Sequence, residues 1–173
     1  MNEEMEYFNY LNSLKRKEIK NKFSFLGEGI SRRVYDLNNG LVLKLAKGRE
    51  GHYQNQVEHF VYTHADLNQK KYLCPILFFT PRMIVMKKAE PLTSKIKAKY
   101  LNLKTIRPEE SAFEDINNLA KRFLLLYEDI VSPTSWGSLN EKNVLIDYGC
   151  TCEEGDKYYH LIFRINRLTD LGL

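Results

Sequence analysis

The strongest constraint on the fold comes from residues 22–87, where five short segments have the pattern of β-strands. The second and third flank Asn38-Asn39-Gly40, which is typical of a tight hairpin because Asn and Gly tolerate positive φ. A segment with helical spacing, from about Tyr53 to Leu67, separates the third strand from the fourth. This order predicts a five-stranded antiparallel sheet with one helix inserted. The predicted strands are Phe23–Leu26, Arg33–Leu37, Leu41–Leu45, Pro75–Phe79 and Met83–Lys87.

The rest of the chain is predicted to be mainly helical, so the fold class is α+β. Apolar residues recur at helical spacing in three stretches. Two short strands are expected near the end of the chain, as a hairpin around a polar tip. The predicted helices are 3–21, 92–103 and 109–130, and the two further strands are 143–146 and 160–168.

Composition excludes several classes of protein. The longest apolar runs are too short to cross a bilayer, so no membrane partner is expected. Three cysteines, an odd number, do not suggest a disulfide framework, and a cytoplasmic location is expected. A net charge of +4 is too weak to indicate a nucleic-acid partner. A zinc site at Cys150, Cys152, His160 and Cys74 lacks the spacing of common zinc motifs, which favours free thiols.

One group of residues has the chemistry of a phosphate site. Gly27 and Gly29 lie in a turn between two predicted strands, where backbone N–H groups can approach phosphate oxygens. Lys44, on a neighbouring strand, can neutralise phosphate charge. A buried lysine needs a carboxylate to hold it, and Glu58 in the predicted helix is the best candidate, with Glu50 second.

A second group has oxygen ligands suited to Mg²⁺. Asn143 and Asp170 each lie at the end of a predicted strand, and magnesium prefers carboxylate and amide oxygens. Asp147 is an alternative, but resemblance to a known family implies a pair of strands between the amide and the carboxylate, and the four residues from Asn143 to Asp147 leave no room for them. We therefore interpret Asp147 as a turn residue and Asp170 as the metal ligand.

Several motifs resemble those of the protein-kinase-like superfamily. The segment Leu26–Tyr35 is similar to the kinase glycine-rich loop, with Arg32 in place of the third glycine. Val42-Leu43-Lys44 resembles the V-A-I-K strand, and Leu168–Gly172 resembles the D-F-G segment. The resemblance spans residues 22–173. It implies an N-terminal helix followed by two lobes, the second abbreviated and ending just after the D-F-G-like motif. The implied boundaries are 1–21, 22–89 and 90–173.

The resemblance implies ATP and Mg²⁺ as cofactors. Met86 would be the gatekeeper, and residues 87–89 would face the adenine. The implied nucleotide-binding residues are Gly27, Glu28, Gly29, Val34, Lys44, Met86 and Lys88. The implied catalytic residues are Lys44, Glu58, Ser138, Asn143 and Asp170, of which Asn143 and Asp170 would hold the metal.

The pattern breaks at the catalytic aspartate. Residues 136–146 align with H-R-D-L-x-x-x-N and the strand after it, which places Ser138 at the aspartate position. A serine hydroxyl cannot accept a proton near pH 7 as a carboxylate does. The expected function is therefore a serine/threonine-kinase-like phosphotransferase that binds ATP and is weakly active or inactive. Two alternatives remain: a non-enzymatic pseudokinase that acts by binding a partner protein, and a small-molecule phosphotransferase. In addition, a protein partner or a second copy of the chain is expected to complete the small second lobe.

Overall fold

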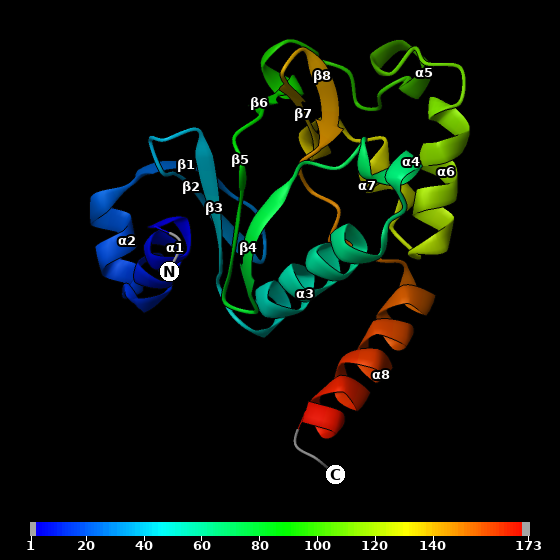
Figure 1. Ribbon diagram of the computed structural model, residues 1–173. Coiled ribbons are helices and arrows are strands. Elements are labelled where there is room, and N and C mark those ends of the chain that lie inside the picture. The colour runs from blue at the N-terminus through cyan, green and yellow to red at the C-terminus, as the bar shows by residue number, and fades with distance from the viewer. Residues whose placement is uncertain (1–2, 171–173) are drawn as a thin grey trace.

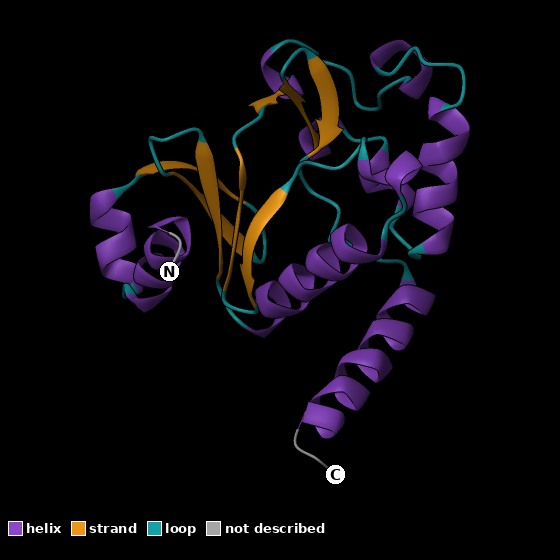
Figure 2. Ribbon diagram, viewed as in Figure 1, coloured by secondary structure: helices purple, strands orange, loops and turns teal. Residues whose placement is uncertain are grey.

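The structure is a computed structural model that describes residues 3–170, with side chains up to residue 167. Two separate sheets are surrounded by helices, which confirms the α+β class (Figures 1 and 2). No helix in the described part of the chain is both long and apolar enough to span a membrane.

The larger sheet has five antiparallel strands in the order β1-β2-β3-β5-β4, as predicted. Asn38 and Gly40 adopt positive φ of 61° and 78°, which explains why this turn closes the β2–β3 hairpin. The strands are β1 Ser24–Glu28, β2 Arg32–Asp36, β3 Leu41–Ala46, β4 Ile76–Thr80 and β5 Met83–Lys87.

Two N-terminal helices cover one face of this sheet (Figure 1). They are α1 (Glu3–Ser13) and α2 (Arg16–Lys22), so the prediction of one helix over 3–21 is wrong. The chain is extended at Lys15, whose backbone N–H donates to the Glu18 carboxylate. This break allows both helices to bury apolar side chains against the sheet, among them Phe8, Leu11 and Ile19.

Helix α3 (Arg49–His64) crosses the opposite face, and the larger apolar cluster begins there (Figure 1). Val57 and Val61 are fully buried between α3 and the sheet. The same cluster continues without interruption to Leu145 and Trp136 in the second half of the chain. The predicted boundary between residues 89 and 90 therefore divides a shared core, and the two-lobe division stays a prediction.

The second half contains a three-stranded antiparallel sheet in the order β6-β7-β8 and several short helices. The predicted helix over 109–130 is interrupted because Leu124 adopts a positive φ of 52° and Leu125 bridges to Thr151. Most of 92–103 is irregular, since the Leu101 N–H donates to Val131 O. The elements are α4 Leu67–Lys70, β6 Glu90–Pro91, the 3₁₀ turn Leu92–Ser94, α5 Leu103–Ile106, α6 Ala112–Arg122, α7 Tyr127–Ile130, the 3₁₀ turn Pro133–Ser135, β7 Trp136–Leu139 and β8 Lys142–Leu145.

The last element, α8 (Glu153–Asp170), corrects the predicted strand over 160–168. Its aromatic side chains Tyr159 and Phe163, four residues apart, both contact Phe60 of α3 edge-on, with ring centroids 5.4 and 6.3 Å away. Helical spacing brings these two rings to the face of α8 that contacts α3. Figure 1 shows α8 extending away from the rest of the molecule.

Candidate functional site

A buried ion pair joins the larger sheet to α3. Lys44, in the middle of β3, places its Nζ 2.8 Å from Glu58 Oε1 of α3. Glu58 is completely buried and Lys44 is 6% exposed. This contact confirms the predicted pairing of the two residues. Glu50, the second candidate, lies in the first turn of α3 and borders a pocket instead.

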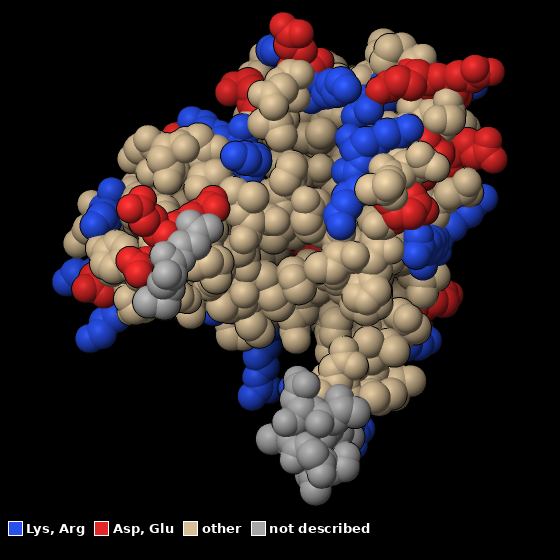
Figure 3. Space-filling view, viewed as in Figure 1, with Lys and Arg blue, Asp and Glu red and all other residues tan. Residues whose placement is uncertain are grey.

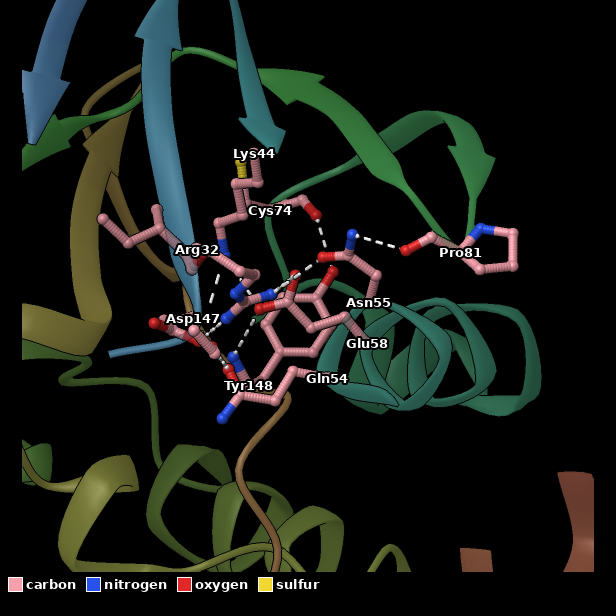
Figure 4. A network of polar contacts seen from close by, with 11 residues as sticks. Arg32, Lys44, Gln54, Asn55, Glu58, Cys74, Pro81, Asp147 and Tyr148 are labelled. Atoms are coloured by element: carbon pink, nitrogen blue, oxygen red, sulfur yellow. Dashed lines mark hydrogen bonds and ion pairs between the residues drawn. The ribbon is translucent and has the colours of Figure 1, made fainter. Parts of the chain in front are cut away.

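Two further charged residues complete the cluster. Arg32, the first residue of β2, places Nη1 3.0 Å from Glu58 Oε2 and Nη2 2.5 Å from Asp147 Oδ1. Lys44 Nζ lies 3.9 Å from the same Asp147 oxygen. Figure 4 shows these side chains converging from the sheet, from α3 and from the segment that follows β8. The interpretation of Asp147 as a turn residue is therefore wrong.

The cluster favours the charged forms of Asp147 and Arg32. Desolvation opposes ionisation of Asp147, but the nearby charges of Arg32 and Lys44 outweigh it and lower the pKa of this carboxyl. Burial likewise opposes the charge on Arg32, while Asp147 and Glu58 raise its pKa. The side chain of Asp147 is 51% exposed, so the cluster is open to solvent on that side.

The backbone around Asp147 is docked directly onto the lysine and α3. Lys44 Nζ donates to Ile146 O at 2.5 Å, and the Tyr148 N–H donates to Glu58 Oε1 at 3.1 Å. The buried Tyr148 hydroxyl donates to Cys74 O. A Cβ on Gly149 would lie 2.6 Å from Gln54 O, so this close approach to α3 requires glycine. These contacts fix the position of the Asp147 carboxylate.

Gly27 lies within β1, opposite Val34, so the prediction that it lies in the turn is wrong, whereas Gly29 begins the glycine turn between β1 and β2. No described atom is within 4 Å of where a Cβ on Gly27 or Gly29 would stand, so packing does not demand glycine at either position. The turn is closed by the Gly29 N–H donating to Arg32 O. Lys47 supports it by donating to Gly29 O at 2.6 Å and pairing with Glu28 at 2.9 Å.

The residues predicted to contact the adenine lie on neighbouring strands. Val34 is half-buried and pairs with Lys44 across β2 and β3. Met86 is buried on β5. Lys88 is exposed, pairs with Asp36 at 2.6 Å, and donates its backbone N–H to Gly40 O. Their nucleotide contacts stay a prediction.

The residues around Ser138 form a β-hairpin, and the catalytic role of this segment stays a prediction. Ser138 of β7 pairs with Asn143 of β8, and the turn between them uses positive φ at Asn140 and Glu141. Asn143 Nδ2 donates to Ile106 O at 2.9 Å, which commits this amide to the packing of the second half. The alignment missed β7 because the turn lacks glycine, the usual hairpin signal.

The structural argument for Asp170 as a metal ligand does not hold. Asp170 was preferred because a strand was expected before it, and that segment is the helix α8. The side chain of Asp170 lies outside the described residues. Asp147, which follows the β7–β8 hairpin directly, is instead the aspartate beside Lys44. The Asp147-Tyr148-Gly149 triplet was the sequence signal for it.

A second carboxylate, missed in the sequence, lies near the same segment. Leu126, at the start of α7, donates its N–H to Cys150 O. Burial raises the pKa of the Cys150 thiol to about 12, helped by a hydrogen bond to the half-buried Asp129 and by the charge of Asp147. Asp129 of α7 therefore lies within electrostatic range of the chain that carries Asp147.

A pocket of about 410 Å³ opens beside Gly149, between α3 and α8. Its wall includes Tyr53, whose ring stacks on His160 at 4.7 Å. Ser31 Oγ donates to Gln54, another wall residue, which connects the glycine turn to this pocket.

The described residues contain no group of three His, Cys, Asp or Glu side chains placed to hold a metal ion. All three cysteines are free thiols in this part of the chain. On the face drawn in Figure 3, Lys and Arg are interspersed with Asp and Glu toward the rims, and the centre is largely uncharged.

No protein-family model matches the chain, and no curated protein matches it. Among solved structures, a chain from the streptomycin–ATP–APH(2″)-IIa ternary complex matches with 20% sequence identity and a TM-score of 0.36. The match covers 64% of this chain and 34% of that one, so this chain spans about a third of the matched protein's length. A likeness of this strength assigns neither fold nor activity, and the interpretation depends on the contacts within the chain.

Proposed function

We propose that the chain binds ATP in a protein-kinase-like fold and acts as a phosphotransferase. The observation that carries this proposal is the convergence of Lys44, Glu58 and Asp147 from three elements distant in sequence. A lysine on the third strand, a glutamate on the following helix and an aspartate after a hairpin form the order expected of a kinase-like phosphate site.

The phosphates would lie on the exposed side of Asp147, next to Lys44 and the glycine turn. Lys44 supplies a positive charge that Glu58 holds in place, and phosphoryl transfer depends mainly on such positioning and charge neutralisation. The open space around Gly27 and Gly29 supports a backbone approach to phosphate oxygens. Val34, Met86 and residues 87–89, with Lys88 among them, would contact the adenine.

Asp129 is our candidate for the general base, in place of Ser138. Ser138 lies in the central strand of the smaller sheet and is paired on both sides, whereas Leu126, three residues before Asp129, donates its N–H to Cys150 O in the segment that follows Asp147. A carboxylate can accept the proton of an acceptor hydroxyl, a step that typically contributes about a hundred- to ten-thousand-fold in rate. This assignment removes the main reason to expect an inactive protein.

The residues first predicted to hold magnesium do not carry the proposal. Asn143 donates its amide N–H to Ile106 O, an interaction that does not use the amide oxygen a metal would bind, and the strand expected to present Asp170 is a helix. Asp147, the carboxylate that lies in the cluster, already contacts two side-chain cations. The proposed function is therefore ATP binding and phosphoryl transfer, and no step of it is assigned to a metal ion.

The first test is ATP binding, measured by isothermal titration calorimetry with and without Mg²⁺. We expect binding in at least one of these buffers, and we expect Lys44→Met to abolish it, because Lys44 provides the phosphate charge. Lys157→Met removes an exposed lysine on α8 and is the matched control. A folded wild-type protein that binds no ATP in either buffer would contradict the proposal.

The second test is turnover of ATP with labelled γ-phosphate. Asp129→Asn is expected to lower the rate about a hundred- to ten-thousand-fold, because an amide cannot act as the base. Glu128→Gln, at an exposed acidic neighbour on α7, is the control and should retain the rate. Wild-type protein that binds ATP without turnover would instead favour the non-enzymatic pseudokinase.

A further inference from the structure

Arg32 is a buried guanidinium at the edge of the glycine turn. Its side chain is 6% exposed and runs inward from the start of β2 (Figure 4). It contacts Asn55 Oδ1 at 3.4 Å, Glu58 Oε2 at 3.0 Å and Asp147 Oδ1 at 2.5 Å. A charged side chain is rarely buried to this extent unless it is paired, and here two carboxylates surround it.

The cluster is electrically balanced by side chains alone. Arg32 and Lys44 carry two positive charges, and Glu58 and Asp147 carry two negative charges. Removing one member of such a buried set leaves an uncompensated charge, which is strongly destabilising. Arg32 is thus an integral member of the site, although its position in the resembled loop belongs to glycine.

The guanidinium lies where a metal ion on Asp147 would lie. Mg²⁺ binds a carboxylate oxygen at about 2.0–2.1 Å, and Arg32 Nη2 already approaches Oδ1 of Asp147 at 2.5 Å. A metal on the exposed part of that carboxylate would stand beside the cations of Arg32 and Lys44, and repulsion between like charges would oppose it. Glu58 Oε1 accepts hydrogen bonds from Lys44 and the Tyr148 N–H, whereas the buried Oε2 has no hydrogen-bond partner among the described residues and faces Arg32 Nη1 at 3.0 Å.

We propose that Arg32 replaces the divalent metal ion at Asp147, so that the site binds ATP without a metal. Arginine suits this role because its planar fork of N–H donors matches phosphate oxygens. A triphosphate on the exposed side of Asp147 would lie next to the cluster in which Arg32 and Lys44 are each oriented by a carboxylate. The inference rests on the proposed function, since it concerns the same ATP site.

The test is a titration of wild-type protein with ATP in EDTA and in millimolar Mg²⁺. We expect dissociation constants that agree within about threefold in the two buffers, since Arg32 rather than a metal ion occupies the Asp147 carboxylate in both. Binding that weakens more than about tenfold in EDTA overturns the role of Arg32 and leaves the proposed function intact. Absence of binding in both buffers overturns the proposed function and this inference together.

A second experiment measures ATP binding by variants at Arg32. Arg32→Gln should weaken binding in EDTA at least about tenfold, and Mg²⁺ should restore part of it, because Asp147 becomes available to a metal. Arg33→Gln is the matched control: this neighbour on β2 is exposed and pairs with Glu28. A folded Arg32→Gln protein that binds metal-free ATP as tightly as wild type overturns the inference. If circular dichroism shows that this variant is unfolded, the wild-type titration decides.

Discussion

At the scale of single residues, Glu58 shows why burial decides which charges matter. It accepts contacts from Lys44, Arg32 and the Tyr148 N–H in a fully buried position. Removing it would leave buried cations unpaired, at a cost of about 3–5 kcal/mol. The pair between Lys88 and Asp36 is also short, but Lys88 is 40% exposed, and such surface pairs contribute at most about 1 kcal/mol.

The glycines allow a prediction at the same scale. Gly149→Ala should lower the free energy of unfolding by about 1–3 kcal/mol, because its Cβ would overlap Gln54 O and crowd Glu58. Gly27→Ala should change stability by less than about 0.5 kcal/mol, since open space surrounds that position. Urea denaturation of both variants measures the difference. Equal losses would show that α3 does not press on Gly149.

At the scale of elements, α3 connects the other parts of the molecule. One side carries Glu58 into the charged cluster, and another presents Phe60 to the aromatic side chains of α8. His59 stacks on Phe79 of β4, with ring centroids 4.0 Å apart. The position of α3 therefore depends on packing against both the sheet and α8, as well as on its own sequence.

The His59 contact predicts a pH dependence. Burial, together with nearby His64, lowers the pKa of His59, so folding favours the neutral ring. This contribution is fully present above the unfolded pKa of about 6.5 and is lost as the pH falls below it toward the folded value. The melting temperature should therefore fall between about pH 7 and pH 5, with a smaller fall in His59→Phe. His52→Gln, elsewhere on α3, should keep the wild-type slope, and a slope unchanged in His59→Phe would assign the effect to other groups.

At the scale of the whole molecule, one apolar cluster extends from α3 and β5 to β8 and α6. Trp136, the single tryptophan, is fully buried in it and donates Nε1–H to Ile130 O. The two sheets therefore share a core, which favours unfolding as one unit.

This shared core predicts a single transition. Tryptophan fluorescence, which reports on the second half, and far-ultraviolet circular dichroism, which reports on all elements, should give coincident urea midpoints. Fluorescence that changes at a lower urea concentration than the dichroism would show that the half containing the β7–β8 hairpin unfolds separately.

Much of the first half could be predicted from the sequence. The strands around Asn38-Asn39-Gly40 follow from local alternation and from a turn that tolerates positive φ, and both are properties of neighbouring residues. The pairing of Lys44 with Glu58 followed as well, because a buried lysine on β3 requires a carboxylate from the helix that comes next. The sequence by itself thus determined the sheet, the inserted helix and one ion pair.

Only the tertiary structure placed Asp147 beside Lys44. The segment 160–168 has apolar residues compatible with either a strand or a helix, and contact of Tyr159 and Phe163 with α3 accompanies the helix. The inward position of Arg32 could not be predicted from the local sequence pattern either, because its two carboxylate partners, Glu58 and Asp147, are distant in the chain. Hydrophobic periodicity predicts local secondary structure, because it depends on residues close together in the chain. The partner of a buried charge depends instead on which distant elements pack together.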